Sequence, residues 1–92
     1  VPQTARKYEN GDSRVVKLSE LEIGDKVLVQ PGERIPVDGV VIEGTSEVDQ
    51  SLLTGESIPV AVKEKSEVIA GSLNGTHPLV IVTIRRWLKL FD

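Results

Sequence analysis

The sequence predicts a small, mainly β domain of the β-sandwich or jelly-roll type with one short helical turn. Short runs rich in Val, Ile and Thr alternate with turns that contain glycine or proline. No segment repeats its apolar residues with the helical period over three turns. With 92 residues, of which only three are aromatic, the chain is expected to form one domain with a modest aliphatic core.

Four pairs of turn-forming residues divide the chain into its expected strands. Asn10-Gly11, placed between two extended runs, is a strong signal for a β-hairpin. Pro31-Gly32, Asp38-Gly39 and Gly44-Thr45 mark further reversals, and Asp38-Gly39 is expected to be a tight turn between two strands. The expected strands are residues 5–8, 14–17, 26–30, 35–37, 40–43, 46–49, 58–62, 68–70 and 79–84.

One helical turn is expected between the hairpin and the third strand. Ser19 and Glu22 have the spacing of a capping box. Leu18 and Ile23 have the spacing of a hydrophobic staple, and Gly24 follows as a terminator. The segment has room for a single turn only.

Composition excludes several classes of function. A formal net charge of −3, without a basic stripe interleaved with aromatic residues, argues against a nucleic-acid partner. The absence of cysteine excludes a disulfide framework and a thiolate metal site, and the single His77 cannot form a histidine cluster. The longest apolar runs are far too short to span a membrane. No glycine-rich nucleotide-binding motif is present.

The segment 48–60 carries the best candidate for chemistry. Glu56 directly follows Gly55 and lies between the hydroxyl residues Thr54 and Ser57, at the expected tip of a loop between apolar segments. A glycine lets the backbone turn sharply and lets another surface approach closely. This pattern fits a general base presented to a partner outside the domain. The alternative interpretation of Glu56 is an exposed, solvated acid in a polar turn.

Three blocks together resemble a known family. They are Gly24-Asp25-Lys26-Val27, the stretch from Pro31 to Val41, and the stretch from Val48 to Val60. In this order and at these spacings they resemble the actuator domain of P-type ATPases. The Ile-Pro-Val-Asp-Gly and Asp-Gln-Ser-Leu-Leu-Thr-Gly-Glu-Ser forms are most similar to the heavy-metal-transporting branch. The resemblance covers residues 2–84.

The resemblance implies a distorted jelly roll and a role for the segment around Glu56. It implies that Thr54, Gly55, Glu56 and Ser57 dock against an aspartyl phosphate in a separate domain, where Glu56 orients a water molecule or takes its proton. Five further residues are expected to shape the loop or its surroundings: Asp49, Gln50, Pro59, Asp38 and Gly39. Many family members carry glutamate where this chain has Gln50. Arg34, by contrast, is expected to be a solvated charge.

The resemblance also implies a larger parent protein. That parent would be an integral membrane pump that hydrolyses ATP with Mg²⁺ through other domains, and this chain would be one of its cytoplasmic domains. The expected partners are the phosphorylation and nucleotide-binding domains of the same chain and its membrane helices. No cofactor and no metal ligand is assigned to this chain. As an isolated fragment it is expected to be monomeric and inactive.

The expected organisation has three parts: an N-terminal linker with the first hairpin strand at residues 1–13, the β core at 14–84, and a C-terminal linker or cloning remnant at 85–92. Because the chain opens on Val1 and contains no methionine, we expect an excised domain. Two alternatives stay open: a non-catalytic small β-barrel binding module, and a free-standing hydrolase with Glu56 as its base. The hydrolase is disfavoured because no His or Cys partner accompanies the acid. Copper, zinc, cadmium and cobalt all remain candidate ions.

Overall fold

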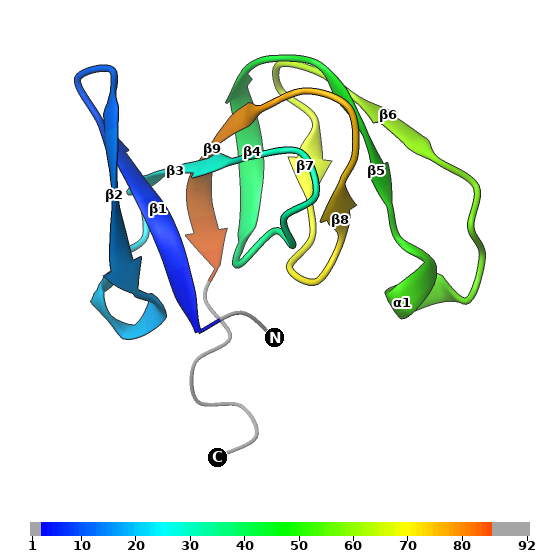
Figure 1. Ribbon diagram of the computed structural model, residues 1–92, viewed down its shortest axis with the longest axis horizontal. Helices are drawn as coiled ribbons and strands as arrows, with labels where there is room; N and C mark the ends of the chain where they lie inside the picture. The colour runs from blue at the N-terminus through cyan, green and yellow to red at the C-terminus, as the bar shows by residue number, and fades with distance from the viewer. Residues whose placement is uncertain (1–2, 86–92) are drawn as a thin grey trace.

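The computed structural model describes residues 3–85, which form a mainly β fold with one short α-helix and one 3₁₀ turn (Figure 1). In chain order the elements are β1 (Thr4–Glu9), β2 (Asp12–Lys17), η1 (Leu18–Glu20), β3 (Lys26–Val29), β4 (Asp38–Glu43), β5 (Ser46–Asp49), α1 (Ser51–Thr54), β6 (Val60–Val62), β7 (Glu67–Val68), β8 (Leu73–Asn74) and β9 (Leu79–Arg85).

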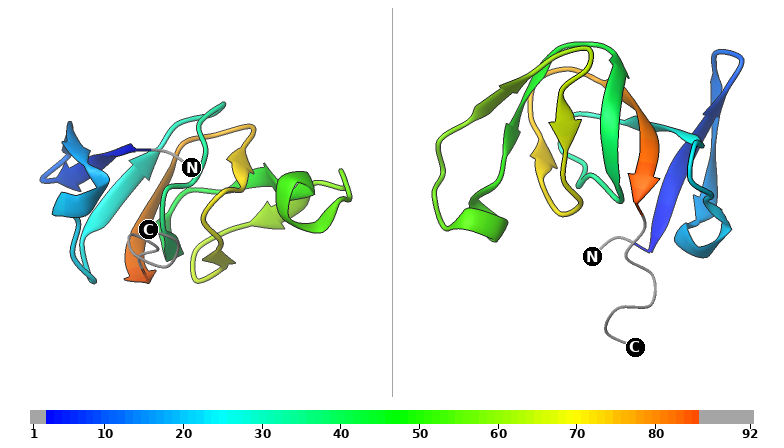
Figure 2. Two further views of the ribbon diagram at one scale, coloured as in Figure 1. Left: turned by 90° about the horizontal axis from the view of Figure 1, so that it is seen from below. Right: turned by 180° about the vertical axis from the view of Figure 1, so that it is seen from behind.

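The strands form two antiparallel sheets. The larger sheet has the order β2-β1-β3-β9-β4-β7, and the smaller has the order β6-β5-β8. Figures 1 and 2 show the β1–β2 hairpin and α1 at opposite ends of the molecule. Within the described residues the larger sheet ends on β2 and β7 and does not close into a barrel. The predicted fold class, a small distorted jelly roll or sandwich, is confirmed.

The core is aliphatic, as the composition predicts. Strand β9 lies between β3 and β4, and its Leu79 and Ile81 are fully buried. Burying one such side chain contributes about 1.5–3 kcal/mol. The buried apolar residues are Ala5, Val16, Leu18, Leu21, Val27, Val29, Ile35, Val37, Val41, Val48, Val62, Val68, Leu79, Val80 and Ile81. This core includes residues of both sheets, and the smaller sheet extends from the larger one towards α1 (Figure 1).

Several predicted elements are confirmed. The β1–β2 hairpin turns at Asn10 and Gly11, both of which have positive φ, as a two-residue type I′ hairpin turn requires. The strands expected at 26–30, 46–49 and 79–84 are β3, β5 and β9. The extended segment expected at 58–62 contains the shorter strand β6. The strand expected at 68–70 overlaps β7 only at Val68, because β7 spans Glu67–Val68. Strand β8 was not predicted, since two residues carry too little pattern to be recognised.

The predicted turn at Asp38-Gly39 is wrong. Both residues belong to β4, which pairs with β9 through irregular register, and residues 35–37 are buried but form no strand. A Cβ on Gly39 would lie 2.7 Å from the carbonyl oxygen of Val82. Glycine is therefore needed here because two strands approach closely, not because the chain reverses.

The predicted capping box is also wrong in position. Ser19 and Glu22 do not form it; instead the backbone N–H of Lys17 donates a 2.8 Å hydrogen bond to Glu20 Oε1 at the start of η1. The turn ends at Leu21, which is extended and fully buried. The turn therefore ends at a residue of the core, which the local spacing of Ser19 and Glu22 does not reveal.

Residues 86–92, which include Trp87 and Phe91, lie outside the described residues, as does most of the predicted C-terminal linker. The three-part division of the chain stays a prediction. Among residues 3–85, no helix has the length and apolar character needed to cross a membrane.

Candidate functional site

The segment predicted to be a loop tip begins as a single turn of α-helix. Helix α1 follows β5 directly, and Gly55 ends it in the left-handed conformation with φ 81°. The backbone N–H of Gly55 donates a 2.8 Å hydrogen bond to the carbonyl oxygen of Ser51. A non-glycine residue would be strained at this φ, so Gly55 is the residue type that permits the sharp exit from the helix. The chain therefore turns sharply between α1 and Glu56.

Thr54 connects Glu56 to the helix. The backbone N–H of Glu56 donates a 3.2 Å hydrogen bond to Thr54 Oγ1. The Thr54 hydroxyl is in turn 3.2 Å from the carbonyl oxygen of Gln50, which it can reach as a donor. Thr54, Gly55, Glu56 and Ser57 are all exposed. Among residues 3–85, no side chain forms an ion pair with the Glu56 carboxylate.

Asp49 and Gln50 shape the start of α1 in different ways. Asp49 Oδ1 accepts a 2.8 Å hydrogen bond from the backbone N–H of Ser51. Hydrogen bonds from Ser51 lower the pKa of the Asp49 carboxyl below its ordinary value, and the charge of Arg34 acts in the same direction. Gln50 acts through its backbone, because its carbonyl oxygen accepts hydrogen bonds from the N–H groups of Leu53 and Thr54. The side chain of Asp49 and the main chain of Gln50 thus together stabilise the single turn of α1.

The structure does not bring Asp38 and Gly39 into the exposed loop. Asp38 is buried, and its Oδ1 accepts a 2.8 Å hydrogen bond from the backbone N–H of Ala70, while Oδ2 accepts a 3.0 Å bond from Arg85 Nε. These contacts fix the chain around β7 and the end of β9. Pro59 is exposed between Ser57 and β6.

One contact of α1 was missed by the sequence interpretation. A Cβ placed on Gly71, which has φ 96°, would lie 3.4 Å from Leu53 Cδ2, so the Leu53 side chain lies directly over Gly71. Leu53 is 47% exposed, whereas its neighbour Leu52 is 68% exposed. No local pattern signals this contact, because the two residues are brought together only by the fold.

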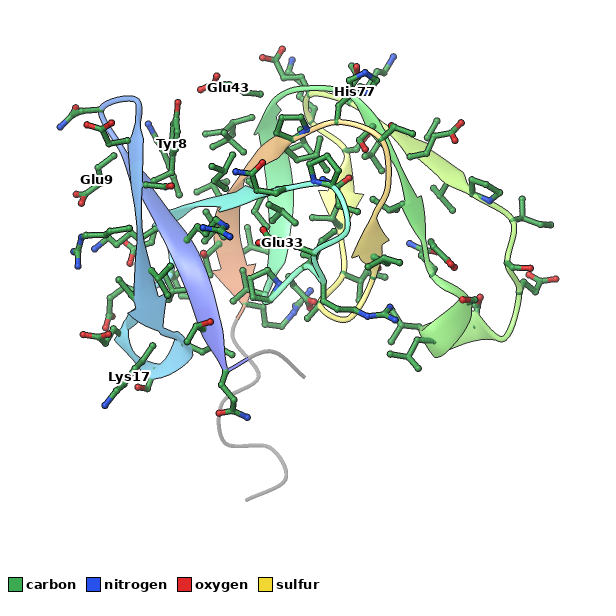
Figure 3. The ribbon with its side chains drawn as sticks, viewed as in Figure 1. Tyr8, Glu9, Lys17, Glu33, Glu43 and His77 are labelled. Atoms are coloured by element: carbon green, nitrogen blue, oxygen red, sulfur yellow. The ribbon has the colours of Figure 1, made fainter. Side chains whose placement is uncertain are left out.

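The site is a protrusion and not a pocket. A hollow of about 260 Å³ is lined by Arg6, Leu28, Glu33 and Pro36, among others, and by no residue of the segment 49–59. Figure 3 shows Glu33 and His77 well away from α1. Within residues 3–85, no group of three or more His, Asp or Glu side chains lies together in a way that could hold a metal ion. Chemistry at Glu56 therefore needs a second surface that supplies the reacting group.

Comparison with known proteins identifies the family. The profile of the P-type ATPase actuator domain matches residues 1–89. The chain is 53% identical over 76 residues to a probable cobalt/nickel-exporting P-type ATPase of Mycobacterium tuberculosis, covering 83% of this chain and 12% of that protein. It is 51% identical over 81 residues to a copper-exporting P-type ATPase B of Archaeoglobus fulgidus, covering 88% of this chain and 12% of that protein. The chain thus spans only 12% of the length of these relatives.

The fold agrees with the sequence comparison. The crystal structure of a zinc-transporting PIB-type ATPase in an E2.Pi state superposes with a TM-score of 0.86 at 33% identity. The match covers 92% of this chain and 14% of that one. The chain therefore belongs to the P-type ATPase actuator domain family and is most like the members of its heavy-metal-transporting branch.

Proposed function

We propose that this actuator domain promotes hydrolysis of an aspartyl-phosphate intermediate in a heavy-metal cation-transporting P-type ATPase, with Glu56 as the reacting carboxylate. The observation that carries the proposal is the position of Glu56, exposed directly after the left-handed Gly55 at the end of α1. An exposed acid directly after a sharp backbone turn is suited to enter a site on another domain. The four-residue segment Thr54 to Ser57 is the part that would dock.

The proposed reaction requires only one reacting group from this chain, a carboxylate. In the reaction a water oxygen forms a bond to phosphorus, and the bond from phosphorus to the aspartate oxygen breaks. Glu56 would hold the water in line and accept its proton. Docking would also exclude bulk water from around the carboxylate and the phosphate. Thr54 would keep the Glu56 backbone in place through the hydrogen bond described above.

The proposal extends to the parent protein. ATP and Mg²⁺ would be used by its phosphorylation and nucleotide-binding domains, and movement of this domain would be transmitted to its membrane helices. The chain would then be a cytoplasmic domain of an integral membrane protein, monomeric when isolated and without nucleic-acid partners. The relatives are named for cobalt/nickel, copper, silver and zinc, so we propose the heavy-metal class of cargo and no single ion.

No observation favours the alternatives. A β-barrel binding module is not supported, because the larger sheet is open within the described residues. A free-standing hydrolase would need partners for Glu56, and residues 3–85 provide no ion-pairing side chain for it.

The test is the lifetime of the phosphorylated intermediate in the full-length parent, compared between wild type and Glu56→Gln. Glutamine keeps size and hydrogen bonding but cannot act as a base. We expect normal formation and decay at least about tenfold slower, which corresponds to about 1.4 kcal/mol of barrier. Glu64→Gln, at an exposed acid beyond β6, is the matched control and should decay normally. Unchanged formation and decay in Glu56→Gln would contradict the proposal.

A further inference from the structure

Helix α1 has few contacts that could fix its direction. It is one turn long and contributes no buried residue to the core. A helix this short is not stable by itself, so its orientation must come from contacts with the rest of the fold. Glu56 follows the C-terminal end of α1. Contacts that fix the orientation of the helix therefore also influence the direction in which the Glu56 carboxylate points.

The turn between β7 and β8 provides one such contact. Gly71 lies in this turn beneath the side chain of Leu53. Two side chains hold this turn: Arg34 Nη1 donates a 2.9 Å hydrogen bond to the carbonyl oxygen of Gly71, and the buried Asp38 accepts one from the N–H of Ala70. The backbone of Ile35 adds a 2.8 Å hydrogen bond from the Gly71 N–H. A guanidinium from a distant part of the chain is therefore one of the groups that hold the surface beneath Leu53.

Arg34 also lies near the other end of α1. Leu73 in β8 pairs with Asp49 on one edge and forms a bridge with Arg34 on the other. Directly opposed residues share one face of a sheet, so the side chains of Arg34 and Asp49 project from the same face, about 10 Å apart at the backbone. Asp49 is the residue that accepts the Ser51 N–H at the start of α1.

The electrostatics agree with this placement. The positive charge of Arg34 contributes to the lowered pKa of Asp49, behind the larger effect of the Ser51 hydrogen bonds. A carboxylate that stays ionised remains a hydrogen-bond acceptor for the helix N–H. Arg34 thus acts on both ends of α1: it holds the turn beneath Leu53 and favours the charged form of Asp49.

We infer that Arg34 is a positioning residue for Glu56, acting through Gly71 and Leu53 at one end of α1 and through Asp49 at the other. This inference deepens the proposed function and rests on it. Arg34 does not touch the reacting atoms; its role is to keep α1 in the orientation of this structure, in which Glu56 is exposed. A solvated surface arginine, which is what the sequence predicts, would have no such effect.

The first test measures order in the 92-residue chain itself by ¹⁵N relaxation. In wild type, the backbone amides of Thr54, Gly55 and Glu56 should have order parameters close to the rigid value of about 0.85. In Arg34→Gln they should fall towards the flexible range below about 0.6, while the amide of Ile81 in β9 stays rigid. Arg14→Gln, at an exposed arginine in β2, is the matched control and should leave α1 unchanged.

A second pair of variants tests the contact with Gly71 independently. Leu53→Ala removes the side chain that lies over Gly71, and the same loss of order is expected at Gly55 and Glu56. Leu52→Ala removes an equally apolar but more exposed side chain and should have no effect. Unchanged order parameters in both Arg34→Gln and Leu53→Ala would overturn the inference, whatever the role of Glu56.

The functional test uses the full-length parent. Arg34→Gln should leave formation of the phosphoenzyme unchanged and slow its decay by about two- to twelvefold, the range that corresponds to the net value of one hydrogen bond. Normal decay in Arg34→Gln beside slow decay in Glu56→Gln would overturn the positioning role and leave the proposed function standing. Normal decay in Glu56→Gln would instead remove the proposed function, and the positioning role with it.

Discussion

Thr54 Oγ1 accepts a 3.2 Å hydrogen bond from the backbone N–H of Glu56, so a residue of α1 holds the main chain of the residue that follows the helix. The same hydroxyl lies 3.2 Å from the carbonyl oxygen of Gln50, at the opposite end of the turn. The hydroxyl therefore links the residue before α1, Gln50, to Glu56, which follows the end of the helix. This arrangement makes Thr54 the most direct restraint on the Glu56 backbone.

Thr54→Val should weaken this restraint while keeping the shape of the side chain. In the full-length parent we expect slower decay of the phosphoenzyme, by about two- to twelvefold, because one hydrogen bond is worth about 0.5–1.5 kcal/mol net. Thr54→Ser keeps the hydroxyl and should decay at nearly the wild-type rate. Equal rates for the valine and serine variants would show that the hydroxyl has no part in holding Glu56.

Two buried serines should differ in the effect that removal of their hydroxyl has on stability. Ser46 Oγ donates a 2.6 Å hydrogen bond to Asn74 Oδ1, and both side chains are buried. Ser46→Ala should lower the free energy of unfolding by about 1–3 kcal/mol, because Asn74 loses a buried partner.

Among the described residues, Ser72 Oγ is the one buried side-chain polar atom without a partner, so Ser72→Ala should be neutral or stabilising. Urea denaturation of the 92-residue chain measures both, and a larger loss for Ser72→Ala would contradict the assignment.

Gly39 and Gly32 should differ in their tolerance of asparagine. Gly32 has φ 85° and open space where a Cβ would lie, and asparagine adopts this conformation more readily than most residues. Gly39 faces the carbonyl oxygen of Val82 at 2.7 Å from its missing Cβ. Gly39→Asn should therefore lower the free energy of unfolding by about 1–3 kcal/mol through strain between β4 and β9. Gly32→Asn should cost less than that. Thermal or urea unfolding of the two variants measures both losses of stability. An equal loss in Gly39→Asn and Gly32→Asn would instead support a turn at Asp38-Gly39.

The pair Arg6–Glu33 should make stability depend on pH in the acid range. Arg6 Nη2 lies 2.8 Å from Glu33 Oε2, and this hydrogen bond is the largest cause of the lowered pKa of Glu33. A carboxyl with a lowered folded pKa stabilises the fold above its ordinary value of 4.5, and this stabilisation is lost as pH falls through the folded value. Because the pair is partly exposed, we expect about 1 kcal/mol or less.

The measurement is urea denaturation of wild type, Glu33→Gln and Arg6→Gln between neutral and acid pH. Glu33→Gln cannot titrate at this position, so its free energy of unfolding should fall less on acidification than that of wild type. Arg6→Gln removes the partner and should also fall less. If the free energy of unfolding of either variant fell more steeply on acidification than that of wild type, the Arg6–Glu33 pair would not be the cause of the pH dependence of stability in the acid range.

The elements whose signals are local were predictable. Asn10-Gly11 fixes a hairpin because each residue tolerates positive φ, and that property does not depend on the rest of the fold. The β-branched run of β9 likewise requires an extended chain wherever it packs. The candidate loop could be found because its motif is contiguous, and the family match is consistent with that interpretation. That Thr54 to Ser57 act together is still a prediction.

The elements that depend on distant neighbours were not predictable. Asp38-Gly39 has the composition of a turn, yet the pair is strand because it pairs with β9. The close approach of β9 leaves no room for a Cβ on Gly39. The segment before Glu56 has no helical period, since one turn is too short to show one, and its order depends on contacts outside itself.

By itself, the sequence determined the β class, the aliphatic core, the hairpin and the identity of the exposed Thr-Gly-Glu segment, because each is encoded in neighbouring residues. Only the tertiary structure decided that Gly71 lies beneath Leu53, that Arg34 donates a hydrogen bond to the carbonyl oxygen of Gly71, and that the charge of Arg34 helps to lower the pKa of Asp49. The physical reason is that a contact between residues far apart in the chain exists only after both have been folded onto the same sheet. Such a contact leaves no periodicity or spacing in the sequence from which it could be predicted.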